Sequence, residues 1–178
     1  MFEEYLQDAY IFFQSAQSAT SAGNIREAQR YYRAAVFYAA GAIEAFVNYM
    51  ADSFAKAATL PPHEIAFLND RALYFSVKKG DLAERTEYHK IDDKLRLLIN
   101  RFVPNFDFQD PSWSKLMSFK EFRDSLVHPR AVEDETNLPS YKSKLSAGMT
   151  GIIEIMNIVS QGIFKKPIRK QILDLLPE

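Results

Sequence analysis

Residues 122–130 read FRDSLVHPR, so Arg123 is followed directly by Asp124 and five positions later by His128. An arginine guanidinium keeps its charge at physiological pH and can hold a phosphate through two parallel hydrogen bonds. A histidine can accept and donate protons near neutral pH. A fixed cation and a proton-transfer group about a turn and a half apart suit a phosphodiester substrate.

The residues before this motif predict a helix that begins near Trp113 and ends at His128. Pro129 disfavours helical backbone at the preceding residue, and the partial negative charge of a helix C-terminus favours the imidazolium form of His128. At 100° per residue, Arg123 falls near the middle of one broad apolar arc, which is formed by Leu116, Phe119, Phe122, Leu126 and Val127. An arginine on such a face needs an acidic partner, a carbonyl or a bound phosphate.

A purely structural interpretation also exists, with Arg123 in a buried ion pair and His128 as a C-terminal cap. Glu44 and Asn48 lie one turn apart in an otherwise apolar segment and share a helix face. Glu44 is the expected partner of Arg123, because each charge would offset the cost of desolvating the other. The pair would either serve stability alone, with a cost of about 3–5 kcal/mol when one partner is removed, or orient the arginine.

Apolar periodicity predicts an all-α fold, an up-and-down bundle of about five main helices plus a short tail helix, in a single domain over residues 1–178. A first helix should end at Gly23. Further helices are expected over residues 25–58, 86–102, 113–128 and 141–163, with the tail helix over 168–176. Residues 63–69 suit a short helix, residues 72–77 suit helix or extended backbone, and no alternating run predicts a strand.

The composition removes several function classes. The chain has no cysteine, which excludes disulfides, thiolate metal sites and thiol nucleophiles and fits a reducing cytoplasm. The net charge of −1 is not that of a basic, nonspecific nucleic-acid binder. The C-terminal third is locally basic and suits either a phosphate-binding surface or solvated helix ends; its cations are Lys142, Lys144, Lys165, Lys166, Arg169 and Lys170.

Residues 34–51 are almost as long and apolar as a short membrane span, but Glu44 at their centre would be costly in lipid. We therefore expect a core helix, no membrane partner and a cytoplasmic protein, since the acidic N-terminus also lacks the basic start of a signal peptide. His89 with Asp92 and Asp93 is typical of a solvated helix face, so we assign no metal and no cofactor.

Arg-x4-His at the end of a late helix, in an all-α chain whose second helix contains AIEAFVN at residues 42–48, resembles the HEPN superfamily. The resemblance implies a HEPN-type bundle and a metal-independent endoribonuclease site that leaves a 2′,3′-cyclic phosphate. Two facing protomers would each contribute Arg123 and His128, with Asp124 in the polar position after the arginine. Toxin members paired with a nucleotidyltransferase antitoxin often have a tyrosine two positions after the histidine, where this chain has Arg130.

We therefore expect an RNA-binding HEPN-like protein with single-stranded RNA as its substrate. The composite site would lie at a homodimer interface that includes the helix from Trp113 to Val127, because its apolar arc exceeds what one small bundle covers. The alternatives are a non-catalytic HEPN module, for dimerisation or for a nucleotide or antitoxin partner in a defence system, and a plain helical scaffold. Many members of the superfamily bind without cutting.

Overall fold

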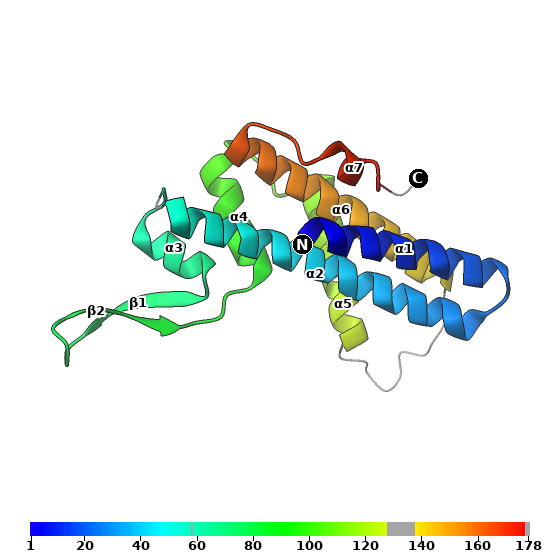
Figure 1. Ribbon diagram of the computed structural model, residues 1–178, viewed down its shortest axis with the longest axis horizontal. Coiled ribbons are helices and arrows are strands. Elements are labelled where there is room, and N and C mark those ends of the chain that lie inside the picture. Colours follow the sequence, from blue (N-terminus) through cyan, green and yellow to red (C-terminus); the bar gives the residue numbers. More distant parts are fainter. Residues whose placement is uncertain (58, 128–137, 177–178) are drawn as a thin grey trace.

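The computed structural model describes residues 1–57, 59–127 and 138–176, and these residues are mostly helical, as predicted (Figure 1). The elements in chain order are α1 (Phe2–Ser21), α2 (Ile25–Ala57), α3 (Pro62–Leu68), β1 (Arg71–Ser76), β2 (Asp81–Thr86), α4 (Ile91–Phe102), α5 (Pro111–Val127), α6 (Leu138–Phe164) and α7 (Lys170–Leu173). Buried apolar side chains from α1, α2, α4, α5 and α6 form one continuous core.

Helices α1 and α2 form the antiparallel hairpin expected from the sequence. Gly23 lies between them with φ of 76°, a left-handed conformation that glycine adopts without steric cost. Helix α2 spans the whole length of the bundle (Figure 1), and its buried face runs from Ala28 to Phe54.

Of the two alternatives predicted for residues 72–77 the extended one is confirmed, but the prediction that no run forms a strand is wrong for residues 71–86. Strands β1 and β2 pair antiparallel, with Phe75 opposite Leu82, and Figure 1 shows this hairpin projecting from one end of the molecule. Gly80 has φ of 66° in the connecting turn. The pairing also delays the start of α4 to Ile91, five residues after the expected position. Neither strand alternates apolar and polar residues. Such alternation arises where one face of a sheet is buried, and neither face of this hairpin is buried.

A buried lysine joins the hairpin to the bundle. Lys94 on α4 is 1% exposed, and its ammonium lies 2.7 Å from a carboxylate oxygen of Asp70, directly before β1. Asp70 also accepts a hydrogen bond from the backbone N–H of His89. Burial raises the pKa of Asp70, but that hydrogen bond and the Lys94 ammonium outweigh it and hold the pKa below its usual value.

Helices α5 and α6 approach closely because α6 carries glycine at two facing positions. A Cβ at Gly148 would overlap the ring of Phe119, and a Cβ at Gly151 would lie 2.8 Å from the backbone nitrogen of Leu116. Phe122 is also buried at this contact, with its ring 5.3 Å from that of Tyr141 on α6. One protomer therefore covers the core of the apolar arc of α5, which removes the reason for expecting a second copy on that face.

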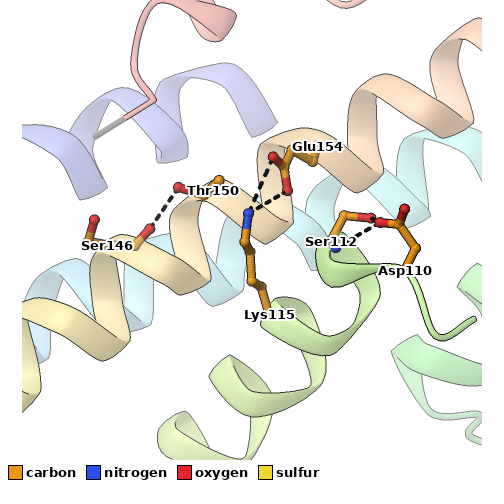
Figure 2. Close-up of polar contacts among 6 residues, drawn as sticks. All are labelled: Asp110, Ser112, Lys115, Ser146, Thr150 and Glu154. Atoms are coloured by element: carbon orange, nitrogen blue, oxygen red, sulfur yellow. Dashed lines mark hydrogen bonds and ion pairs between the residues drawn. The ribbon is translucent and has the colours of Figure 1, made fainter. Parts of the chain in front are cut away.

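Polar contacts hold the start of α5 in place (Figure 2). Asp110 precedes Pro111, the first helical residue, and accepts hydrogen bonds from the backbone N–H and the hydroxyl of Ser112 at 2.8 and 2.5 Å. These bonds hold the pKa of Asp110 below its usual value. One turn on, the Lys115 ammonium lies 3.1 Å from the Glu154 carboxylate on α6. The helix that carries Arg123 is thus fixed at its N-terminal end.

Helices α2 and α6 are long and apolar enough to cross a membrane by length and composition, and 56% and 50% of their most apolar windows are buried inside the bundle. The core helix of a soluble protein passes the same test. The described structure uses both helices to build its core.

Candidate functional site

Arg123 lies on the side of α5 that faces α2, where two carboxylates hold its guanidinium. Its Nη2 donates to Glu44 Oε1 at 3.2 Å, and its Nη1 lies 3.0 Å from Asp124 Oδ1. The predicted pairing of Glu44 with Arg123 is confirmed. The prediction that both charges are buried is wrong, because the side chains are 29% exposed for Arg123 and 46% for Glu44.

His128 lies outside the described residues, as do Pro129 and Arg130. The described part of α5 ends at Val127, so the structure does not define the distance between Arg123 and His128. The role of His128 therefore stays a prediction from the motif.

Asn48 does not reach Arg123. It is exposed one turn beyond Glu44 and lines a separate hollow of about 880 Å³ between α1, α2 and the C-terminal end of α6, together with Tyr49 and Arg169. Glu44 lines both this hollow and the pocket beside Arg123. Asn48 therefore lies on α2 one turn from Glu44, as predicted. It does not belong to the site around Arg123.

The pocket beside Arg123 has a volume of about 420 Å³ and lies between α2, α5 and the start of α4. An apolar wall includes Ile43, Leu95, Leu116 and Phe119, and its ionisable lining residues are Glu44, His89, Lys90, Asp92, Lys120, Arg123 and Asp124. This combination of an apolar floor and a few convergent charged groups is what a small-ligand or nucleotide site requires.

A second ion pair lies in the same pocket. The Lys120 ammonium is 2.5 Å from Asp92 Oδ1. Burial raises the pKa of Asp92, but the hydrogen bond and charge of Lys120, the backbone hydrogen bond and the charge of Lys90 together outweigh it and hold the pKa below its usual value. Lys120 is one turn before Arg123, so α5 presents two cations on the pocket side, each facing a carboxylate from another helix.

Two pocket residues were missed from the sequence. His89 was assigned to a solvated face, but its ring packs on Phe67 with centroids 4.0 Å apart, and its Nε2 is buried without a hydrogen-bond partner among the residues that the structure describes. Lys120 was not singled out. Lys120 could have been predicted from its position three residues before Arg123, because that spacing places both side chains on one side of α5. No group of three or more potential metal-ligating side chains occurs in the described ranges.

The basic C-terminal third does not form one surface. Lys142 and Lys144 lie near the start of α6 and Lys165 to Lys170 at or beyond its end, about 30 Å apart at 1.5 Å per residue. Arg169 pairs with Glu3 at 3.0 Å. The interpretation of these residues as separate, solvated helix ends fits this arrangement.

Chemically, the arginine site is a cation held by weak contacts. Ion pairs between partly exposed groups contribute about 0–1 kcal/mol, whereas a phosphate can accept two charge-assisted hydrogen bonds from one guanidinium. A phosphate oxygen can therefore replace Glu44 or Asp124 at low cost. Comparison with protein-family models, with curated proteins and with solved structures finds no match to this chain.

Proposed function

We propose that this chain is a HEPN-type, RNA-binding homodimer that cleaves single-stranded RNA without a metal, in the cytoplasm. The observation that carries the proposal is Arg123, the cation of the Arg-x4-His motif, at the edge of a 420 Å³ pocket in contacts that a phosphate can displace. The HEPN-type assignment itself rests on this motif and on the helix order.

In the proposed reaction the ribose 2′-hydroxyl attacks the adjacent phosphorus and the 5′-oxygen of the next nucleotide leaves. A base takes the proton of the 2′-hydroxyl, an acid gives a proton to the leaving oxygen, and the product is a 2′,3′-cyclic phosphate. His128 from the two protomers supplies the base and the acid. Arg123 stabilises the negative charge that develops on the phosphorane oxygens.

Glu44 and Asp124 orient the guanidinium in this scheme. Each occupies one terminal nitrogen of Arg123 in the absence of RNA. Replacement of one carboxylate by phosphate leaves the other as a fixed support, so the arginine stays aimed while it binds.

The test is cleavage of a labelled single-stranded RNA in excess chelator. We expect the wild type to cut, and we expect His128→Ala and Arg123→Ala each to slow cleavage by about 100-fold or more. Arg101→Ala is the matched control, because Arg101 is also a partly exposed arginine in an ion pair, with Glu64. Cleavage that survives His128→Ala, or that requires added metal, contradicts the mechanism.

A second candidate is a non-catalytic HEPN module that binds a nucleotide or an antitoxin partner in a defence or toxin–antitoxin system. It is favoured by the two carboxylates on Arg123, which already offset the positive charge that the phosphorane would need. RNA that remains intact with every variant, while the wild type binds it in an anisotropy titration, would select this candidate.

A further inference from the structure

Along one side of helix α2 runs a row of side chains that the other described residues leave exposed or half-buried. At 100° per residue the side chains of this face fall within an arc of about 100°. Every one of them is exposed or half-buried, while the remaining faces pack against α1, α4, α5 and α6. We call this face the α2 stripe; it consists of Arg26, Arg30, Arg33, Phe37, Gly41, Glu44, Asn48 and Asp52.

The charges of the α2 stripe are divided by sign. Its first half holds three arginines and its second half holds Glu44 and Asp52. None of the three arginines forms an ion pair within the described ranges. Among the described residues Asp52 pairs with Lys56 of the same helix alone, and both side chains are more than half exposed. A face that is basic at one end and acidic at the other is complementary to an antiparallel copy of itself.

The centre of the stripe is apolar and hollow. Phe37 is 47% exposed, and beside it lies a depression of about 350 Å³ lined by Tyr5, Phe37, Tyr38 and Gly41. Gly41 adds no side chain to this space, and the ring of Tyr5, 3.4 Å from where a Cβ of Gly41 would lie, forms one wall of the depression. A large exposed aromatic next to a depression is the arrangement of an interface anchor and its pocket.

One antiparallel register satisfies both features. When the two-fold axis passes at the level of residue 39, Phe37 of one copy faces Gly41 of the other, Arg30 faces Asn48, and Arg26 faces Asp52. Arg33 then lies within one residue of Glu44. The contact runs over about 39 Å of helix at 1.5 Å per residue, and each half of it pairs opposite charges.

We infer that two copies of this chain associate through the α2 stripe, antiparallel, with Phe37 of each copy in the depression at Gly41 of the other. The inference rests on the homodimer part of the proposed function and does not depend on RNA cleavage. It replaces the apolar arc of α5, which α6 covers, as the pairing surface.

The pairing brings the arginine sites of both copies to one interface. Glu44 belongs to the stripe and also binds Arg123. Arg33 of the second copy offers Glu44 a second cation, and a carboxylate shared in this way holds Arg123 less tightly. Association thus frees Nη2 of Arg123 for a phosphate oxygen, which couples the dimer to the site.

Sedimentation velocity at about 1–50 µM, the range of ordinary protein dimers, tests the inference without RNA. We expect the wild type at twice the 20.5 kDa of one chain and Phe37→Glu at the monomer mass, with unchanged circular dichroism. Phe75→Glu is the matched control. It makes the same change at a 62% exposed phenylalanine of the distant hairpin and should stay dimeric.

A charge exchange tests the register. Arg26→Glu and Asp52→Arg each place like charges opposite one another and should weaken dimerisation about tenfold, whereas the double variant restores opposite charges and should recover most of the affinity. A double variant no tighter than either single variant overturns the register.

The possible outcomes distinguish a failure of the α2 stripe from a failure of the proposed homodimer. A wild-type monomer at 50 µM removes both the stripe and the homodimer. A dimer that Phe37→Glu leaves intact, or that Phe75→Glu dissociates, overturns the stripe and leaves the homodimer. If Arg26→Glu weakens RNA binding while the dimer persists unchanged, the stripe is an RNA surface and the inference is also wrong.

Discussion

The guanidinium of Arg123 is partly exposed and lies between two carboxylates that solvent reaches. The guanidinium therefore has no large desolvation penalty to offset, and its ion pairs add little to the stability of the fold. A cation that stability does not require is available for a ligand. The exposure of these ion pairs therefore supports the proposed binding role of Arg123 more than the structural ion pair that the sequence also allowed.

We expect Glu44→Gln to lower the free energy of unfolding by no more than about 1 kcal/mol, instead of the 3–5 kcal/mol of a buried pair. The reason is the half-exposed carboxylate of Glu44. Glu154→Gln is a matched control, because the Glu154–Lys115 pair is exposed to a similar degree. Urea unfolding of both variants measures the effect, and a loss above 3 kcal/mol for Glu44→Gln alone would show that the pair is buried in solution.

At the scale of elements, α5 is held by its capped start and by its close approach to α6. Gly148 and Gly151 allow the backbones to come together, so the position of Arg123 depends on residues about 25 positions further along the chain. Substitutions on α6 that touch neither the pocket nor the arginine should therefore move the site.

Gly148→Ala should destabilise the protein by about 1–3 kcal/mol, because the added methyl group overlaps the Phe119 ring in a packed core. Gly41→Ala is the control. Its methyl group would lie 3.4 Å from Tyr5, in ordinary contact, and alanine favours helix over glycine by about 1 kcal/mol.

Both glycine variants are measured in the Phe37→Glu background, so that association does not enter the comparison. Thermal unfolding gives the difference. Equal effects of the two substitutions would mean that α5 and α6 do not pack as closely as described.

For the whole molecule, the hairpin and the bundle are joined by a charge pair instead of an apolar interface. Asp70 has a lowered pKa, so the unfolded chain binds more protons than the folded protein where this group titrates. The stability it contributes is complete above the unfolded value of about 3.9 and is lost as the pH falls through the lower folded value.

We therefore expect Asp70→Asn to reduce stability at pH 7 and to make stability less dependent on pH below about 4. Urea unfolding between pH 3 and pH 7 measures both effects. Asp8→Asn serves as the control, since Asp8 forms no ion pair within the described ranges. An unchanged pH dependence in Asp70→Asn would show that the Lys94 contact does not form in solution.

The sequence by itself determined where the main helices lie. Gly23 follows the end of α1, Pro61 and Pro62 separate α2 from α3 and begin α3, and the 3.6-residue period marks each buried face. The pairing of Glu44 with Arg123 was also predictable, because each was an unexplained charge on an apolar helix. The helix-ending signals and the helical period act over one or two turns, so a single chain segment contains their causes, whereas the pairing followed from the cost of leaving either charge without a partner.

Only the tertiary structure decided the hairpin, the exposure of the Glu44–Arg123 pair and the free stripe on α2. Strands β1 and β2 are set by cross-strand pairing, which has no periodic signature when neither face is buried. How far Arg123 is buried depends on how α5 packs between α2 and α6, and two glycines on α6 set the close approach on the α6 side. The distance between packed helices, and the surfaces that this packing leaves open, have no counterpart in local sequence.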